Sequence, residues 1–294
     1  MWGLAAAGIA WHCTDVAQKI TYITLADGRR KERKLPLLFR LLLPLTPNLK
    51  PVFNRPSFAK IRAAAARRIT AAGFDGLISN EEFLALRLLL PCTFGVLWIL
   101  AAVCAIPPGR KPFLRAIAVF LYMTGPLWLY AYPAVWLKKA LTMRHKSIQR
   151  SLPFVLDLLT LSVEAGMDFM TALQRNVERR MVDPLNEELI KVIREIQLGK
   201  TRREALRNMS DRVNMSELRS VTNALIQADE LGVSIGAMLR IQSGQIRQRR
   251  FERAEKLANE APVKMLFPLL FFIFPAVILI LLAPIVAMIR QHGL

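Results

Sequence analysis

The residue types that most often perform chemistry are scarce in this sequence. The thiols and imidazoles lie far apart along the chain: Cys13, Cys92, Cys104, His12, His145 and His292. No Cys-x-x-Cys pair or disulfide framework is present, and a metal site would have to recruit distant ligands. The phosphate-binding motif G-x-x-x-x-G-K-[ST] and the dinucleotide-binding motif G-x-G-x-x-G are absent. The sequence therefore predicts no catalytic, cofactor-binding or metal site.

The composition is both apolar and strongly basic. The 294 residues are 53% hydrophobic, and 41 Lys and Arg against 22 Asp and Glu give a net charge of +19. Such a chain is either a nucleic-acid binder or an inner-membrane protein with basic cytosolic loops. Aromatic residues are sparse between Lys138 and Lys264, where binding to single strands would need stacking platforms. We therefore favour a membrane protein whose basic residues face anionic lipid headgroups.

Three uncharged stretches are long enough to cross a membrane, which takes about 20 apolar residues. They are residues 88–109, 116–137 and 265–289. Aromatic anchors gather toward one end of the second stretch, namely Trp128, Tyr130, Tyr132 and Trp136. Trp98 lies in the middle of the first stretch and does not fit that pattern. The third stretch contains Pro268, Pro275 and Pro284, which predict a bent helix packed against others.

The distribution of basic residues predicts the orientation. Residues 26–84 carry twelve Lys and Arg against five Asp and Glu, and further basic residues follow the second stretch: Lys138, Lys139, Arg144, Lys146 and Arg150. Cytosolic flanks collect positive charge, so the loop between the first two stretches is expected outside and residues 138–264 in the cytosol. Residues 1–25 are a weak apolar segment that either anchors the chain or lies in the membrane interface.

These patterns predict an all-α integral membrane protein in five regions. Residues 1–25 form the weak segment, 26–84 a basic helical region at the membrane surface, and 85–137 a transmembrane hairpin. Residues 138–262 form a cytosolic bundle of six helices, and 263–294 a last transmembrane helix with a short outer tail. The protein has three transmembrane helices, or four if residues 1–25 also span.

Helix-start signals are explicit within the bundle, between residues 150 and 262. Ser151 precedes Pro153 in a predicted first turn, and Asp183 precedes Pro184 as an N-cap. Thr201 to Glu204 and Asn214 to Glu217 read as capping boxes. These signals place helix starts at four points of the bundle.

A repeat of 33 residues also runs through the bundle. Gly166, Gly199 and Gly232 are each followed two residues later by an N-cap type and seven residues later by leucine. The cap residues are Asp168, Thr201 and Ser234, and the leucines are Leu173, Leu206 and Leu239. The pattern predicts tight corners in which glycine ends one helix, the cap starts the next, and leucine faces the core. We interpret these corners as structural.

The opening of the bundle, Leu152-Pro-Phe-Val-Leu-Asp-Leu-Leu-Thr-Leu-Ser-Val-Glu-Ala-Gly166, resembles the start of the type II secretion F domain. Later parts of that domain resemble Glu195-Ile-Gln-Leu-Gly199, Ala228-Asp-Glu-Leu-Gly232 and Ala261-Pro-Val-Lys-Met265. Ala72-Gly73 with Ser79-Asn-Glu-Glu-Phe83 resembles the stretch before the domain in Tad pilus platform proteins of the TadB and TadC type. General secretion and type IV pilus platform proteins carry two F domains. A single one favours the Tad type, with TadC slightly preferred.

The resemblance implies a non-catalytic, multi-pass platform protein of the bacterial inner membrane, without cofactors, that couples a cytosolic secretion ATPase to pilin assembly. Its implied partners are that ATPase, pilin subunits, membrane lipids, and a paralogous platform protein or a second copy, but not nucleic acid. Two other classes stay open. A membrane-embedded enzyme would need acidic or nucleophilic residues inside the spans. A small membrane transporter would need polar residues at mid-membrane and more helices.

Counting helix directions predicts where the ATPase would dock. In an up-and-down bundle with short loops, the three glycine corners lie together at the end away from the membrane. Seven charged residues are expected there, which we call the corner surface: Glu164, Asp168, Lys200, Arg202, Arg203, Asp229 and Glu230. The alternative is that these charges form only a solvated edge.

Overall fold

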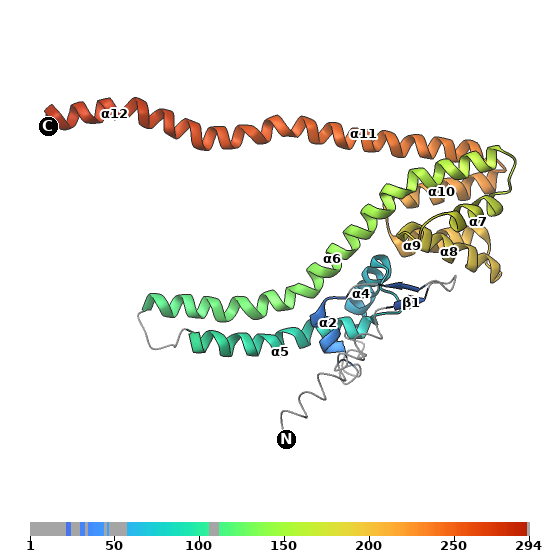
Figure 1. The fold of residues 1–294 in the computed structure, drawn as a ribbon, viewed down its shortest axis with the longest axis horizontal. Coiled ribbons are helices and arrows are strands. Elements are labelled where there is room, and N and C mark those ends of the chain that lie inside the picture. The colour runs from blue at the N-terminus through green and yellow to red at the C-terminus, as the bar shows by residue number, and fades with distance from the viewer. Residues whose placement is uncertain are drawn as a thin grey trace, which may run out of the picture. The chain divides into compact units, whose positions relative to one another are not determined.

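The computed structural model of the chain describes residues 22–24, 30–32, 35–43, 46, 58–105 and 112–292. Chain contacts divide the protein into two units, Met1–Leu239 and Arg240–Leu294. The described part is helical except for one antiparallel pair of strands, β1 (Tyr22–Thr24) and β2 (Arg30–Glu32), in which Tyr22 pairs with Glu32 (Figure 1). The prediction of an all-α fold is confirmed apart from this pair. Most of the predicted N-terminal segment lies outside the described residues.

Two long helices of the first unit, α5 (Asn80–Ala105) and α6 (Pro112–Glu164), lie side by side as a hairpin (Figure 1). Trp98 of α5 packs directly on Gly125 of α6. A Cβ atom at position 125 would lie 2.1 Å from the Cδ1 atom of the indole, so the close approach requires glycine there. This contact accounts for Trp98, the tryptophan that did not fit an interfacial position.

The base of the hairpin is packed by two short helices, α2 (Leu37–Leu42) and α4 (Ala59–Ala72). The core there includes the fully buried side chains of Phe39, Leu86 and Leu90. Phe39 and Phe74 both contact the indole of Trp136, each with ring centroids 4.9 Å apart. Tyr132 contacts Phe39 in turn, with centroids 6.0 Å apart. Two of the four predicted aromatic anchors therefore tie α6 to the N-terminal helices.

Helix α6 is 53 residues long and continues without a break into the bundle. At 1.5 Å per residue it extends about 80 Å. The predicted helix start at Ser151 is therefore wrong. The hydroxyl of Ser151 donates back to the carbonyl oxygens of Ser147 and Ile148, both at 3.2 Å, instead of capping a new helix. Pro153 lies inside the continuous helix.

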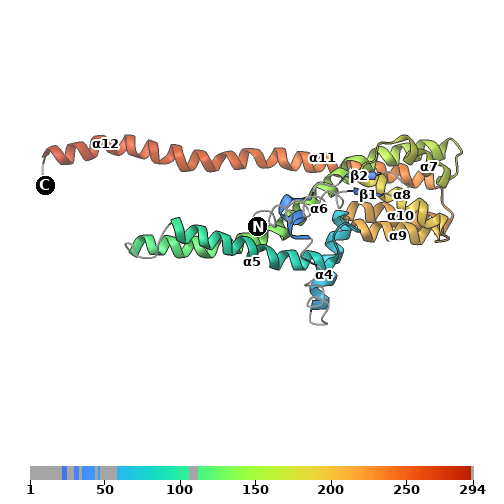
Figure 2. The ribbon, with the colours of Figure 1, turned by 60° about the horizontal axis from the view of Figure 1, so that its bottom comes forward.

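Four shorter helices complete the first unit beside the end of α6 (Figures 1 and 2). They are α7 (Phe169–Arg179), α8 (Pro184–Gln197), α9 (Arg202–Val213) and α10 (Ser216–Leu231). Each packs against its neighbour along the chain or against α6. Residues 150–262, all of which the structure describes, form six helical segments as predicted, from the end of α6 to α11 (Ile235–Pro268).

The second unit is a run of three helical segments, comprising α11 after Leu239, the π-helix η3 (Leu269–Ile273) and α12 (Phe274–His292). Within the described residues, Ile235–Arg290 is the one stretch that length and composition mark as able to cross a membrane. The π-helical turn lies between Pro268 and Pro275, where missing N–H groups interrupt the helical ladder. The other two uncharged stretches lie in α5 and α6, and their crossing of a membrane stays a prediction.

Candidate functional site

Three helix corners share one backbone geometry at the ends of α6, α8 and α10. Gly166, Gly199 and Gly232 have φ values of 89°, 95° and 64°, a region that favours glycine. In each case the next residue donates its N–H to a carbonyl five residues back, at 3.0–3.1 Å. A Cβ atom at any of the three would meet nothing within 4 Å. Backbone conformation, and not space, therefore requires glycine at these corners.

The residues after each glycine behave as the repeat predicted. The carboxylate of Asp168 accepts from the N–H of Met170 at 2.8 Å, and Thr201 forms a complete capping box with Glu204. The hydroxyl of Ser234 accepts weakly from the N–H of Ala237, at 3.5 Å. All three leucines, Leu173, Leu206 and Leu239, are buried. Each corner is thus one glycine, one cap and one core anchor.

The three corners meet at one end of the bundle. The guanidinium of Arg202 lies over the ring of Phe169, 5.4 Å from its centroid, which joins the first two corners. Arg202 also pairs with Asp229 at 3.3 Å, which joins the second corner to the third. A Cβ atom on Gly236 would lie 3.3 Å from the Cγ atom of Glu164, so the third corner also approaches the first.

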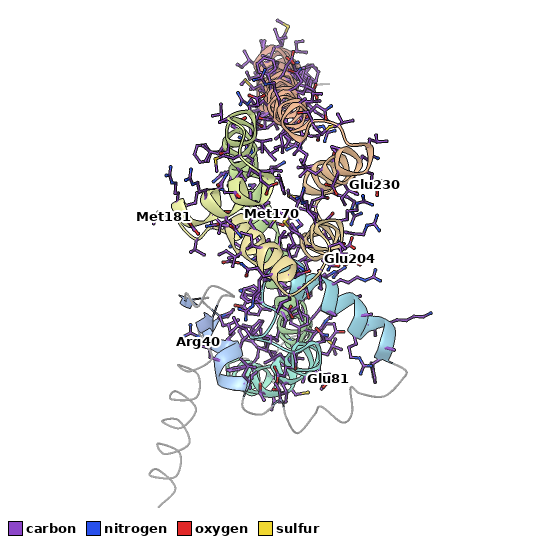
Figure 3. The ribbon with its side chains drawn as sticks, turned by 90° about the vertical axis from the view of Figure 1, so that its right-hand side faces the viewer. Arg40, Glu81, Met170, Met181, Glu204 and Glu230 are labelled. Atoms are coloured by element: carbon purple, nitrogen blue, oxygen red, sulfur yellow. The ribbon has the colours of Figure 1, made fainter. Side chains whose placement is uncertain are left out.

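The charges of the corner surface are mostly paired with one another. Arg203 contacts both Asp229, at 3.4 Å, and Glu230, at 3.3 Å. Lys200 pairs with Glu195 of α8 at 2.9 Å. Figure 3 shows Glu204 and Glu230 on the same side of the bundle, away from Met181. Ion pairs among Arg202, Arg203, Asp229 and Glu230 therefore join the second corner to the third.

Two leucines stand among these charges without packing. Leu198 and Leu231, which directly precede Gly199 and Gly232, are each 77% exposed. Exposed leucines at equivalent positions of two corners add apolar contact area to the corner surface. Apolar side chains surrounded by paired charges are typical of protein interfaces.

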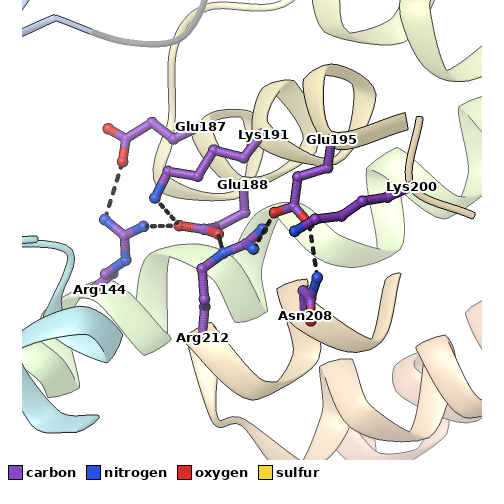
Figure 4. Close-up of polar contacts among 8 residues, drawn as sticks. All are labelled: Arg144, Glu187, Glu188, Lys191, Glu195, Lys200, Asn208 and Arg212. Carbon is purple, nitrogen blue, oxygen red and sulfur yellow. Dashed lines mark hydrogen bonds and ion pairs between the residues drawn. The ribbon is translucent and has the colours of Figure 1, made fainter. Parts of the chain in front are cut away.

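A second polar cluster, which the sequence analysis did not single out, lies inside the bundle (Figure 4). The guanidinium of Arg144 in α6 pairs with Glu187 at 3.0 Å and with Glu188 at 2.9 Å, both in α8. The other oxygen of Glu188 accepts from Arg212 of α9 at 2.9 Å. Lys191 also pairs with Glu188, at 3.0 Å. One buried carboxylate, that of Glu188 in α8, therefore joins α8 to α6 and to the next helix, α9.

The cluster continues to Glu195, which connects it to the corner surface. Glu195 pairs with Arg212 and accepts from Asn208 at 2.9 Å, in addition to its pair with Lys200. Burial alone would raise the pKa of Glu188, but the charges of Lys191, Arg212 and Arg144 outweigh it and hold that pKa below its ordinary value of 4.5. Burial would also raise the pKa of Glu195, but hydrogen bonds from Asn208, Lys200 and Arg212 and the charge of Arg212 outweigh this effect and lower that pKa. Both carboxylates are therefore ionised at neutral pH and poorly suited to act as proton donors.

Two expectations from the sequence need correction here. Arg144 was grouped with the basic residues that flank the membrane, but its side chain is 6% exposed and paired inside the bundle. Asn214 was expected to cap α10, but it ends α9 in a left-handed conformation with φ of 51°. The N-cap of α10 is Met215, which makes no capping hydrogen bond. The short polar side chain of asparagine tolerates the left-handed region, which explains why it serves as a C-cap here.

Gly232-Val-Ser-Ile-Gly236 matches the spacing G-x-S-x-G of many serine hydrolases. That motif works at a turn from a strand to a helix. Here Ser234 lies between two helices, α10 and α11, and its hydroxyl caps the second. Among the described residues, no group of three or more His, Cys, Asp or Glu side chains is placed to hold a metal ion.

The part of the chain that contains the three corners matches a known protein family. Residues 155–283 match the family model described as type II secretion system (T2SS), protein F. The chain carries a type II secretion F domain. This F domain takes in the end of α6, all of α7 to α10 and most of the last helical run, and it includes the three corners. The comparison with curated proteins gave no match, and neither did the comparison with solved structures.

Proposed function

We propose that the protein is a non-catalytic platform protein of a bacterial inner-membrane machine, either a Tad-type pilus or a related type II secretion system. In this role it couples a cytosolic secretion ATPase to the assembly of pilin subunits. The observation that carries the proposal is the F domain at residues 155–283, since proteins with this domain are generally platform proteins of such machines.

The connection between the F domain and the apolar helices supports a mechanical role. Helix α6 runs unbroken from the second uncharged stretch to Glu164, and the helical run from Ile235 reaches the apolar segment at its other end. A continuous helix transmits a displacement along its axis better than a flexible linker does. A motion imposed on the corner end of the bundle would therefore reach the membrane through α6.

The proposed topology places the F domain in the cytosol and the loop between α5 and α6 outside. Reporter fusions test this. A fusion after Ala140 or Ser210 is expected to read as cytosolic, and an insertion at Pro108 as periplasmic. The opposite reading at either position would overturn the topology.

A single F domain also suggests that a second one is supplied by another chain. Two-fold pairing is the commonest symmetry of protein oligomers. Cross-linking in native membranes should capture a homodimer or a pair with a paralogous F-domain protein. A strict monomer in native extracts would contradict this part of the proposal.

The coupling itself is tested with the secretion ATPase of the same gene cluster. A strain without this chain should lose pilus assembly or secretion, while the purified ATPase keeps its activity. The purified platform protein should hydrolyse no ATP by itself, and the ATPase should co-purify with it from membranes. ATP hydrolysis by the protein alone, or normal assembly in its absence, would refute the proposal.

A further inference from the structure

Helix α4 (Ala59–Ala72) carries a basic face that the F domain does not account for. It contains Lys60, Arg62, Arg67 and Arg68 and no acidic residue. Lys60, Arg67 and Arg68 are exposed, and none of them forms an ion pair with a described residue. Spacings of seven and eight residues are close to two turns of an α-helix, so these three side chains share one face.

The opposite face of α4 fixes the helix in the fold. Ala65, Ile69 and Ala72 are buried in the core at the base of the α5–α6 hairpin. Arg62 pairs with Glu81 at the start of α5, at 3.9 Å. Gly73 ends the helix in a left-handed conformation with φ of 76°, and Phe74 then packs on Trp136. The basic face is therefore held outward on a rigid support.

The contact between Phe74, just after α4, and Trp136 determines where α4 lies along the length of the hairpin. Trp136 lies at the end of the uncharged stretch of α6, and exposed Lys138 and Lys139 follow it directly. Aromatic residues followed by lysines mark the boundary between the apolar membrane interior and the headgroups. Figures 2 and 3 show α4 running across the direction of α5, the orientation of a helix that lies along a membrane surface. Ile61, 50% exposed beside the basic residues, adds an apolar side chain to this face.

We propose that α4 is a membrane-surface helix whose basic face, Lys60, Arg67 and Arg68, binds the headgroups of anionic phospholipids. The inference rests on the proposed membrane hairpin of α5 and α6. Charge complementarity identifies the ligand, because a helix without acidic residues at the headgroup level meets a negative surface there. Binding would hold the base of α6 at the inner leaflet and give the platform a fixed reference against which the F domain moves.

Hydrogen exchange of the full-length protein in nanodiscs tests the inference. Nanodiscs of phosphatidylcholine alone are compared with nanodiscs that also contain phosphatidylglycerol. Amides of residues 59–72 should exchange more slowly with phosphatidylglycerol, by at least about fivefold, the effect of one cation near an anionic surface. The double substitution Arg67→Gln and Arg68→Gln should remove this protection. Arg179→Gln with Arg207→Gln, which removes two exposed arginines from α7 and α9, should keep it.

Equal exchange of residues 59–72 in the two nanodiscs would overturn the inference. So would protection that arises in phosphatidylcholine only when the secretion ATPase is added, since the basic face would then be a protein interface. Helix α5 provides an internal reference. If α5 is protected in both nanodiscs, the proposed membrane hairpin is supported independently of the result for α4. If α5 exchanges freely in both, the hairpin is wrong and the lipid site is lost with it.

Discussion

Arg144 and Glu188 form an ion pair of 2.9 Å inside the bundle, although they are 44 residues apart in the chain. Arg144 comes from the long helix α6, and Glu188 comes from α8. Both side chains are almost fully buried, at 6% and 2% exposure. The pair thus holds α6 against α8. Helix α6 leads toward the apolar hairpin, and α8 belongs to the part of the F domain that carries the corner surface.

Replacing Arg144 by methionine should strongly destabilise the protein. The substitution keeps the length of the side chain but leaves the buried carboxylates without their partner in α6. Breaking a buried pair from one side costs about 3–5 kcal/mol. Denaturant unfolding of the detergent-solubilised protein, followed by circular dichroism, measures the loss. Arg150→Met on the exposed face of the same helix is the control and should change the free energy of unfolding by less than about 0.5 kcal/mol.

The stability of the bundle should fall as the pH drops below 4.5. Glu188 and Glu195 have pKa values below the ordinary 4.5 in the folded protein, so folding favours their ionised forms. Their contribution is fully present above the pKa of the unfolded chain and is lost as pH falls below 4.5 through the lowered values. Thermal unfolding midpoints between pH 7 and pH 3 should show this loss.

Glutamine at both positions should flatten that pH dependence. Glu178→Gln removes an exposed carboxylate from α7 and should leave the dependence of the parent protein unchanged. An equally steep fall in acid for Glu188→Gln with Glu195→Gln would show that other groups cause it.

Gly125→Ala should disturb the hairpin of α5 and α6. The added Cβ atom would lie 2.1 Å from the indole of Trp98, so the two helices must separate or the ring must move. Overpacking of this kind costs about 1–3 kcal/mol. Gly244→Ala in α11 is the matched control, because its Cβ atom meets nothing within 4 Å and alanine favours a helix.

A double-mutant cycle identifies the contact. In a Trp98→Ala background the alanine at position 125 has room, and the cost of Gly125→Ala should shrink. Thermal midpoints of the four proteins in detergent give the coupling. An additive result would mean that Trp98 and Gly125 do not meet.

The corner glycines should be sensitive to backbone conformation alone. Gly232→Ala places a Cβ atom at φ of 64° with no neighbour within 4 Å, so the expected loss of about 1–2 kcal/mol comes from the left-handed conformation. Gly232→Asn should cost less, because asparagine tolerates that region. Chemical unfolding distinguishes the two. Equal costs for alanine and asparagine would point to a packing role instead.

Local signals predicted the corners well. The positions of Gly166, Gly199 and Gly232 follow from residue types that act over a few residues, namely left-handed glycine, capping side chains and buried leucines. The family resemblance, which rested on the same stretch, is confirmed by the match to the F domain. A capping signal without a neighbouring glycine was a weaker predictor. Asn214 has the residue type and spacing of an N-cap, but its backbone conformation is that of a C-cap.

The polar cluster could not be predicted in the same way. Arg144 resembles any basic residue that follows an apolar stretch, and only the packing of α8 against α6 reveals its partners. One signal was present in α8. Glu187 and Glu188 lie between the apolar residues Leu185 and Leu189 of α8, and a carboxylate that is buried with such neighbours is expected to be paired. The partner across the bundle depends on tertiary contacts that a single sequence does not specify.

Reversing the charges of Glu164 and Glu230 tests the corner surface as the docking site of the secretion ATPase. Glu164 is exposed, and Glu230 pairs only at the surface, with Arg203 at 3.3 Å and about half of each side chain exposed. Exposed pairs contribute little to stability, so Glu164→Lys with Glu230→Lys should fold and insert normally. If the corner surface docks the motor, this variant should lose pilus assembly and co-purification of the ATPase. Glu178→Lys, at an exposed position near the end of α7 opposite its corner, should keep both.

A charge swap separates docking from the internal pairing of the corners. Arg203→Glu with Glu230→Lys restores an ion pair between α9 and α10 but reverses the charges that a partner would meet. If the ATPase binds the corner surface, the swap should lose pilus assembly, and so should Glu230→Lys alone. Restored assembly in the swap would mean that the pair only joins two corners. Normal piliation in the double reversal of Glu164 and Glu230 would remove both residues from the motor interface.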